Sequence, residues 1–206
     1  MLSGTESCPI GQKNDIYKMK VPGLLSFKAP CISSGWMVIQ RRQDGSVDFA
    51  RKWNDYRAGF GSLTGEFFIG LEKIHQMTKN VKHELFIWLG MHDGSRSYAR
   101  YDDFKIGSND EFYKLISVGE YSGKAGDSLV DSVGSRFSTV DNFNLDDCET
   151  QNTGGWWYPD CDFQSALNGL YYNDGEAMPF TGIQWTTWNG NLSKSIAFTE
   201  IMIKPK

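Results

Sequence analysis

The four cysteines of this chain restrict its fold more than any other feature of the sequence. The chain has no C-x-x-C motif and no cluster of cysteine with histidine, so the sequence does not predict a zinc site. Four cysteines allow three disulfide pairings. The local pairing, Cys8 with Cys31 and Cys148 with Cys161, closes two short loops, and each bridge would stabilise the fold by about 3 kcal/mol. An even number of cysteines in a turn-rich chain indicates an oxidising compartment.

Length and composition indicate one large globular domain or two small ones. The chain has 206 residues and a net charge of −4, which argues against nucleic-acid binding. It contains no apolar run of about 18 residues, so no membrane insertion is expected. Residues 1–7 lack the basic and apolar parts of a signal peptide, so a signal was removed or the chain was excised from a longer protein. We predict a tail over residues 1–7 and a domain over residues 8–206.

Short apolar segments separated by turns predict an α+β domain. The spacing of Leu71, Ile74 and Met77 predicts a two-turn helix over residues 71–78. Glycine and serine dominate residues 119–134, which we expect to be a loop. Apolar runs and alternations predict strands over residues 35–41, 84–89, 97–101, 112–118 and 195–205.

Six segments together resemble one protein family. They are GWMVIQRRQDGSVDFARKWNDYRAGFG (35–61), GEFFIGLEKIHQMT (65–78), ARYDDFKIG (99–107), GGWWYPDC (154–161), LNGLYY (167–172) and GIQWTTW (182–188). In this order and spacing they resemble the fibrinogen C-terminal domain, or fibrinogen-related domain, of ficolin-like, tachylectin-like and angiopoietin-like proteins. The resemblance implies a central twisted antiparallel sheet with short helices and a loop-rich C-terminal subdomain. It also implies the local disulfide pairing and an extracellular, non-enzymatic recognition module.

The acidic loop that begins at Asp141 is the candidate metal site. In the family that this chain resembles, a D-x-D-N-D loop holds calcium, which takes six to eight oxygen ligands. Here Phe143 and Leu145 stand where the second and third acids would be, and the loop is shorter. The alternative is an Asx-type turn, in which Asp141 and Asn142 cap backbone amides. A degenerate calcium site would use Asp141, Asn144, Asp146 and Asp147.

The same resemblance implies a ligand pocket around Cys148. Lectin members of the family hold an acetyl group against this cysteine, beside a cis peptide bond that would here join Asp147 to Cys148. Asp162 replaces a histidine of the family, and Phe180 replaces a small residue. Two acids that line the knob-binding hole of the fibrinogen γ-chain are absent from this chain, which argues against fibrin-type binding. The candidate ligand-binding residues are Asp147, Cys148, Gln151, Asn152, Tyr158, Asp162 and Phe180.

The run Trp156-Trp157-Tyr158 lies between two cysteines of the expected disulfide. Tandem tryptophans in this setting are more typical of core packing than of sugar stacking. We therefore expect at least one tryptophan to be buried and Tyr158 to be exposed.

No arrangement of residues in the sequence indicates catalysis. The chain has three histidines, at positions 75, 83 and 92, and no G-x-S-x-G motif. We predict a secreted, non-enzymatic module that binds a protein receptor or matrix partner through its C-terminal subdomain, with Phe143, Leu145 and Phe180 at the contact. The alternative is an innate-immune lectin that binds acetylated or acidic glycans, with or without calcium.

Two further expectations concern the whole protein. Asn191 begins an N-x-S glycosylation sequon, which agrees with secretion. The chain has no heptad repeat, so oligomerisation is expected to depend on regions outside it.

Overall fold

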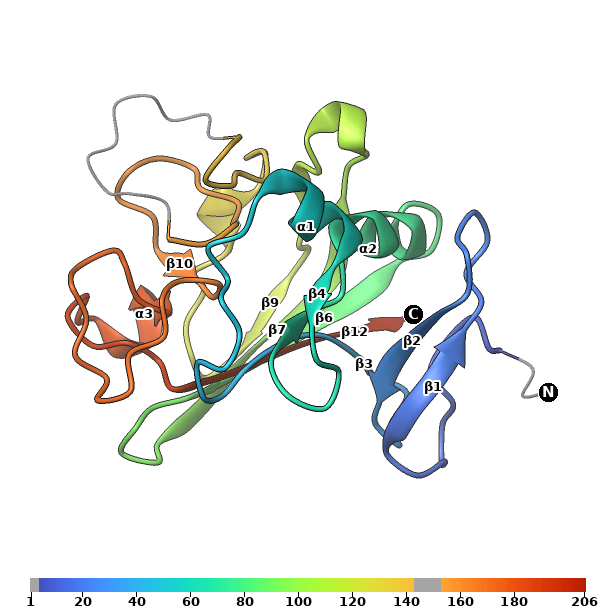
Figure 1. Ribbon diagram of the computed structural model, residues 1–206, viewed down its shortest axis with the longest axis horizontal. Helices are drawn as coiled ribbons and strands as arrows, with labels where there is room; N and C mark the ends of the chain where they lie inside the picture. Colours follow the sequence, from blue (N-terminus) through green and yellow to red (C-terminus); the bar gives the residue numbers. More distant parts are fainter. Residues whose placement is uncertain (1–3, 143–152) are drawn as a thin grey trace.

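The computed structural model describes residues 4–142 and 153–206, which form mainly strands and a few short helices (Figure 1). The helices are α1 (Trp53–Ala58), α2 (Leu71–Thr78) and α3 (Thr186–Asn189), with 3₁₀ turns at Asn109–Glu111 and Val130–Ser132. The strands are β1 (Asp15–Met19), β2 (Phe27–Cys31), β3 (Met37–Arg42), β4 (Phe60–Gly61), β5 (Phe67–Phe68), β6 (His83–Gly90), β7 (Arg96–Ile106), β8 (Leu115–Ser117), β9 (Tyr121–Gly123), β10 (Ser165–Ala166), β11 (Gln184–Trp185) and β12 (Phe198–Pro205). This is the predicted α+β fold class.

An antiparallel sheet forms the centre of the molecule. Its main path runs β1-β2-β3-β12-β6-β7-β8, while β4 and β5 join at β3 and β9 joins at β7. The last strand in sequence, β12, therefore lies in the middle of the sheet. Its residue Ile201 pairs with Gln40 of β3 on one side and with Ile87 of β6 on the other. The sheet thus joins segments from the beginning, middle and end of the chain.

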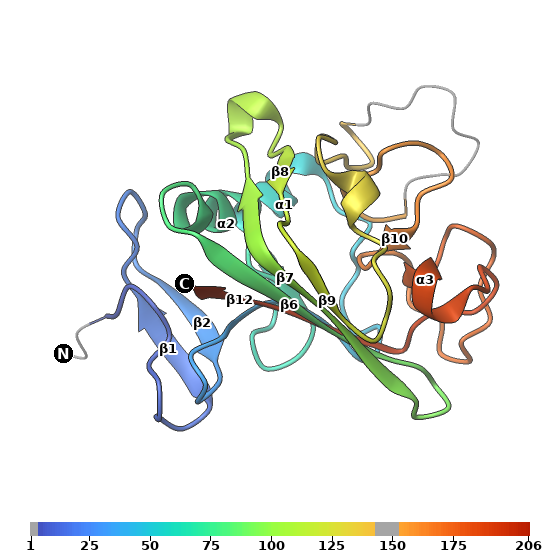
Figure 2. The same cartoon turned by 180° about the vertical axis from the view of Figure 1, so that it is seen from behind.

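The other elements lie around this sheet. Helices α1 and α2 lie close together above it in Figure 1, and the view from behind in Figure 2 agrees. The β1–β2 hairpin stands at one end of the molecule, and the C-terminal segment with β10 and α3 stands at the opposite end. The C-terminal segment contains mostly turns and a two-stranded sheet of β10 and β11. This is the loop-rich subdomain that the resemblance implies.

The predicted strands and helix follow from the apolar pattern. In β6, Leu85, Ile87 and Leu89 are each at most 2% exposed, whereas Trp88 on the other face is 39% exposed. Successive side chains of a strand point to opposite faces, so only one face of β6 joins the central core. Helix α2 has the predicted limits and buries Leu71, Ile74, Met77 and Thr78.

Residues 112–118 differ from the prediction of a strand. Only Leu115–Ser117 pair as β8, because Phe112 and Tyr113 have positive φ angles of 52° and 45°. This bend is held by hydrogen bonds: the backbone N–H of Phe137 donates to the Phe112 carbonyl at 3.0 Å. The indole N–H of Trp157 donates to the Tyr113 carbonyl at 2.8 Å. Residues 119–134, expected to be a loop, contain the short strand β9 and a 3₁₀ turn.

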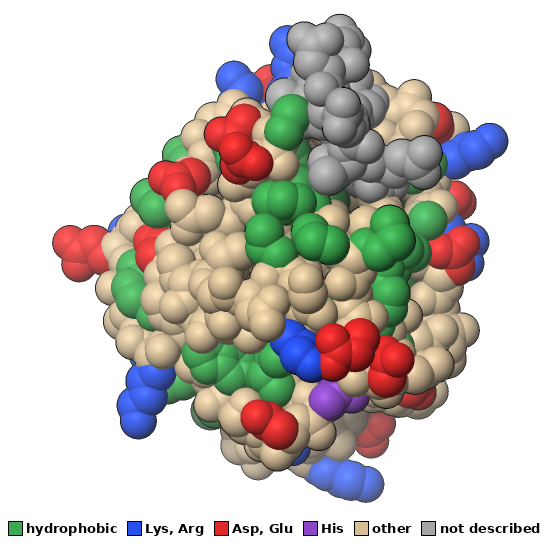
Figure 3. Space-filling model, turned by 90° about the vertical axis from the view of Figure 1, so that its left-hand side faces the viewer, with side chains coloured by type: hydrophobic (Ala, Val, Ile, Leu, Met, Phe, Trp, Pro, Cys, Tyr) green, Lys and Arg blue, Asp and Glu red, His purple; other side chains and the backbone are tan. Residues whose placement is uncertain are grey.

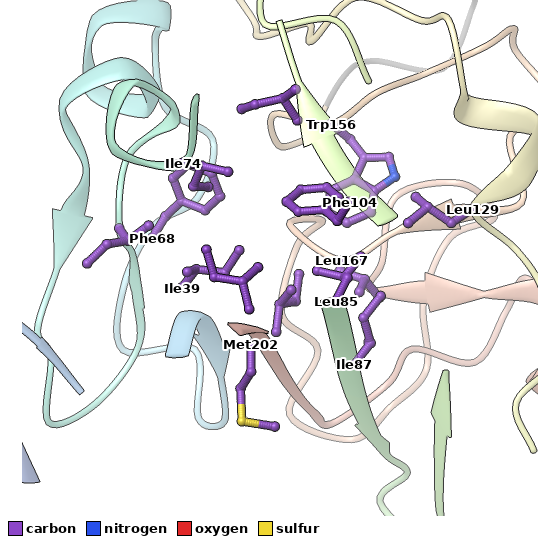
Figure 4. Packing of buried hydrophobic residues seen from close by; sticks show 14 of the residues in the cluster. Ile39, Phe68, Ile74, Leu85, Ile87, Phe104, Leu129, Trp156, Leu167 and Met202 are labelled. Carbon is purple, nitrogen blue, oxygen red and sulfur yellow. The ribbon is translucent and has the colours of Figure 1, made fainter. Parts of the chain in front are cut away.

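A single hydrophobic core extends from the sheet into the C-terminal segment. In Figure 4, Ile39, Leu85 and Ile87 of the sheet lie near Phe68 and Ile74 on one side and near Trp156 and Leu167 on the other. Trp156 and Leu167 are at most 1% exposed. The C-terminal segment is therefore fixed to the sheet by burial as well as by chain connectivity.

The N-terminal hairpin carries the first disulfide. Cys8 and Cys31 are bonded, as predicted, and Cys161 is also disulfide-bonded. Its expected partner, Cys148, lies outside the described residues. Thr5, in the segment expected to be a tail, exchanges backbone hydrogen bonds with Lys18 and Lys20. Within the described residues, no helix is long and apolar enough to cross a membrane.

Candidate recognition surface

Thr181 organises the turns at the surface of the C-terminal subdomain. Its carbonyl accepts hydrogen bonds from the backbone N–H of Leu170 at 2.9 Å and from the Thr153 hydroxyl at 2.8 Å. Its hydroxyl lies 2.8 Å from the Tyr172 hydroxyl and donates to the Met178 carbonyl at 2.7 Å. Residue 153 and the turns at residues 170–172 and 178–181 are thereby held at one place.

Phe180 lies on this turn in a conformation that is uncommon for a large side chain. Its φ angle is 63°, in the left-handed region that non-glycine residues rarely occupy. The half-buried ring packs edge-to-face on Phe163 at a centroid distance of 5.4 Å, and Phe163 packs on Tyr158 at 4.6 Å. The neighbouring Asp162 is exposed, and its backbone N–H donates to Asp160 at 3.0 Å. Phe180 and Asp162 are thus connected through Phe163.

Apolar side chains around Thr181 form an exposed surface, which we call the C-terminal patch. Met178 is 68% exposed and Leu170 is 39% exposed, while Tyr172 and Phe180 are half-buried. Figure 3 faces this end of the molecule and shows hydrophobic side chains gathered in the middle of the face. The C-terminal patch comprises Leu170, Tyr172, Met178, Pro179 and Phe180.

Charged residues border the C-terminal patch. Glu176 forms an ion pair with Lys194, and the exposed Asp174 accepts a hydrogen bond from the backbone N–H of Glu176 at 3.0 Å. Figure 3 shows acidic and basic side chains around the apolar area. An apolar area with a polar border is the usual arrangement of a protein-binding surface.

The Trp156-Trp157-Tyr158 run contributes to the core and not to this surface. Both tryptophans are buried, at 1% and 4% exposure, which agrees with the prediction. Tyr158 was expected to be exposed, but it is only 3% exposed. Its hydroxyl donates to the Gly154 carbonyl at 2.8 Å, so its polar atom is satisfied inside the protein. Burial raises the pKa of Tyr158 well above its usual value.

Asp141 caps a helix that is distant in sequence. Its Oδ1 accepts hydrogen bonds from the backbone N–H of Trp53, the first residue of α1, and from the Thr139 hydroxyl, both at 2.8 Å. Asn142 and Thr139 exchange two backbone hydrogen bonds in the same turn. Asp141 therefore caps a backbone amide, but this amide belongs to a helix 88 residues away and not to an Asx-type turn, and Asn142 takes part through its backbone. Desolvation raises the pKa of Asp141, but these hydrogen bonds outweigh it and lower the pKa below its usual value.

The cap predicts a pH-dependent loss of stability. We expect Asp141→Ala to cost about 1 kcal/mol of the free energy of unfolding at neutral pH. Because the folded pKa is lowered, the carboxylate stabilises the fold above the unfolded pKa of about 4, and this contribution is lost as the pH falls through the folded value. Urea denaturation of both proteins at neutral and acidic pH measures this difference.

Asp110 supplies the control for that experiment, because it is exposed and its side chain accepts no hydrogen bond among the described residues. Asp110→Ala should change stability by less than about 0.5 kcal/mol at either pH. A loss for Asp141→Ala that stays constant in acid would contradict the role of the ionised cap.

Asn144, Asp146, Asp147, Cys148, Gln151 and Asn152, with Phe143 and Leu145, lie outside the described residues. Within the described residues, no group of three His, Cys, Asp or Glu side chains could hold a metal ion. His75 and His83 each place Nδ1 against a backbone carbonyl oxygen.

Comparison with known proteins identifies the family. The family model described as "Fibrinogen beta and gamma chains, C-terminal globular domain" matches residues 28–206. The chain belongs to this family. This confirms the resemblance inferred from the six sequence segments.

Individual relatives and structures agree with this assignment of the fibrinogen-like domain. Tenascin-R of Gallus gallus is 40% identical over 200 residues, covering 92% of this chain and 14% of that protein. Fibrinogen C domain-containing protein 1 of Homo sapiens is 41% identical over 179 residues, covering 83% of this chain and 38% of that protein. The chain therefore spans well under half the length of these relatives.

Two solved structures share the fold. The fibrinogen-like globe domain of human ANGPTL2 matches with a TM-score of 0.86 and 33% identity, covering 94% of this chain and 93% of that one. Lamprey fibrin D-dimer, in complex with the peptide Gly-His-Arg-Pro-amide, matches with a TM-score of 0.87 and 31% identity, covering 95% and 70%. The fibrinogen-like fold is thus shared over nearly the whole chain.

Part of the surface of this fibrinogen-like domain was predicted from the sequence. Phe180 and Asp162 were predicted, whereas Leu170, Tyr172 and Met178 were not. Their common feature is hydrogen bonding to Thr181 within irregular turns, where no apolar periodicity indicates which side chains are exposed. The LNGLYY segment that includes Leu170 and Tyr172 was available as a signal, since it places apolar residues beside a glycine.

Proposed function

We propose that this fibrinogen-like domain is a secreted, non-enzymatic recognition module that binds a protein receptor or matrix partner through the C-terminal patch. The observation that carries the proposal is the exposed apolar area around Thr181, where Met178 is 68% exposed. The occurrence of related domains in tenascin-R and angiopoietin-like proteins also supports a recognition role.

The composition of the C-terminal patch favours a protein over a glycan. Methionine is flexible and adapts to an apolar partner surface, whereas sugar binding uses exposed aromatic ring faces, and the two aromatic residues of the patch, Tyr172 and Phe180, are half-buried. The Trp156-Trp157-Tyr158 run cannot supply such faces because all three side chains are buried. The lectin hypothesis would therefore have to depend on other residues.

Replacement of Met178 by aspartate tests the proposal. We expect the domain to bind at least one member of an array of extracellular receptor and matrix ectodomains. Met178→Asp should weaken this binding about tenfold or more, because a charge would be desolvated in an apolar contact. Surface plasmon resonance measures the affinity.

Leu25 provides a matched control for that variant. It is 93% exposed in the hairpin at the opposite end of the molecule, so Leu25→Asp should leave binding unchanged. Equal effects of the two variants would contradict the assignment of the contact to the C-terminal patch. Binding to acetylated or acidic sugars on a glycan array, with no ectodomain bound, would instead support the lectin alternative.

Calcium binding stays a separate proposal. Asp141 could offer only Oδ2 to the ion, since Oδ1 already accepts two hydrogen bonds. The other candidate ligands lie outside the described residues. Calorimetric titration with calcium tests the site: heat of binding that disappears in Asp141→Ala supports it, and no heat from the unaltered domain refutes it.

Secretion, glycosylation and oligomerisation also stay proposals. Asn191 is exposed, and its side chain accepts a hydrogen bond from the Ser193 backbone N–H at 3.0 Å. An exposed turn is the surface setting that a glycosylation acceptor requires. Loss of an electrophoretic mobility shift in Asn191→Gln, secreted from eukaryotic cells, tests the modification.

A further inference from the structure

A cavity of about 460 Å³ lies at the end of the molecule opposite the C-terminal patch. It is bounded by the segment before Cys8, the β1–β2 turn at Val21–Gly23, the C-terminal end of α2, and the ends of β6 and β12. Its volume lies within the range of about 300–1,000 Å³ that is common for small-molecule sites. The N-terminal hairpin therefore closes over a space that is large enough for a ligand.

The walls of this cavity are mainly apolar. Val21, Met37, Met77 and Ile203 line it and are each at most 7% exposed. Val81 also lines the cavity but is 47% exposed, so the cavity reaches the surface beside this residue. The two methionines have flexible, polarizable side chains that adapt to different apolar shapes. The body of a ligand in this space would be apolar.

His83 supplies one polar group to the cavity, beside Gln76, whose buried Oε1 has no hydrogen-bond partner among the described residues. The His83 side chain is only 6% exposed, and its Nδ1 lies 2.8 Å from the Val81 carbonyl oxygen. A carbonyl oxygen can only accept, so Nδ1 carries the hydrogen. Burial lowers the pKa of His83, which keeps the ring neutral at pH 7. Nε2 is therefore an acceptor, and no hydrogen-bond partner for it occurs among the described residues.

The charges at the cavity favour a neutral ligand. Glu6 and Lys79 both line it and carry opposite charges. Neither forms a salt bridge within the described part of the chain. The two charges are opposite and sum to zero, so the cavity has no net charge that would select an anion or a cation.

We propose that this cavity binds a neutral, mainly apolar small molecule that carries one hydroxyl group, with the hydroxyl donating a hydrogen bond to Nε2 of His83. The site is independent of the C-terminal patch, so its failure would leave the proposed recognition function unaffected.

Naphthol and its methyl ether are suitable probes, because they have the same aromatic body but only naphthol carries a donor hydrogen. We expect naphthol to produce saturable shifts of the backbone amide NMR signals of residues 76–83 in the full chain. The methyl ether should bind about tenfold more weakly, the effect of one lost hydrogen bond. Absence of saturable shifts would overturn the site, and equal affinities of the two probes would overturn the role of His83.

Cavity-filling variants locate the site. Val81→Trp should weaken naphthol binding about tenfold or more, because the indole would occupy the opening of the cavity. Val133→Trp is the matched control, since Val133 is 41% exposed and does not line the cavity. Unchanged affinity in Val81→Trp, or equal weakening in both variants, would overturn the assignment.

Discussion

Replacement of Glu66 by alanine is expected to destabilise the domain by about 3–5 kcal/mol, a large part of the stability of a typical domain. Glu66 is fully buried beside Arg42, which is 1% exposed, with 3.7 Å between Arg42 Nε and Glu66 Oε1. The Glu66 carboxylate also accepts backbone hydrogen bonds from Gln43, Asp44, Gly45 and Val47. Alanine would leave these amides without their acceptor and the buried Arg42 charge without its counter-ion.

Arg42 connects the sheet to the C-terminal subdomain, so loss of Glu66 would affect both of these parts. Its Nη1 donates to the Gly169 carbonyl in the C-terminal subdomain at 2.7 Å, and its guanidinium lies 4.0 Å from the centre of the Phe49 ring. Desolvation lowers the pKa of Arg42, and the charge of Glu66 opposes this shift. Removal of Glu66 would therefore leave a buried cation at the joint between the sheet and the subdomain.

Urea denaturation gives the free energies of unfolding for the Glu66 variants. Glu66→Gln should lose less than Glu66→Ala, because the amide oxygen can still accept some of the hydrogen bonds. Glu84→Ala is the control: Glu84 pairs with Arg100 at 2.6 Å, but Arg100 is 45% exposed, so the loss should be under about 1 kcal/mol. Similar losses for Glu66→Ala and Glu84→Ala would contradict the importance of burial.

The second large effect is expected at Trp156. Trp156→Ala should cost about 3–5 kcal/mol, because it leaves a cavity in the core. The indole is 1% exposed, packs on Trp157 at a centroid distance of 5.3 Å, and donates to the Ser165 hydroxyl at 3.2 Å. The unfolding free energy from urea denaturation measures the loss.

Trp88 permits the same substitution on the outer face of the sheet. It is 39% exposed and contacts Phe86 and Tyr98, so Trp88→Ala should cost about 1 kcal/mol. A loss at Trp156 no larger than the loss at Trp88 would show that the tandem tryptophans do not support the core.

Local pattern was sufficient to predict some elements of the fold and not others. The limits of α2 were predicted because Leu71, Ile74 and Met77 have helical spacing and glycine precedes them. The bend at Phe112 and Tyr113 was not predicted, because it depends on hydrogen bonds donated by Phe137 and Trp157, which are distant in sequence. The apolar pattern alone could not reveal these partners.

The candidate site was predicted less completely than the fold. Tyr158 has an amphipathic side chain that can be either buried or exposed. It is buried here because its hydroxyl donates a hydrogen bond to the Gly154 carbonyl, which the local sequence does not indicate. Met178 has no periodic neighbours, so nothing in the local sequence indicates that it is exposed next to Phe180. Asp141 was predicted to cap an amide in a local turn. Instead it accepts a hydrogen bond from the backbone N–H of Trp53, which lies 88 positions away.

The central position of β12 has a consequence for synthesis of the domain on the ribosome. Strands β3 and β6 become neighbours of β12 only after residues 198–205 have left the exit tunnel. Until then, both strands expose unpaired backbone groups at edges that can pair with other nascent chains. The nascent chain is therefore most exposed to aggregation through these two edges until this strand has been translated.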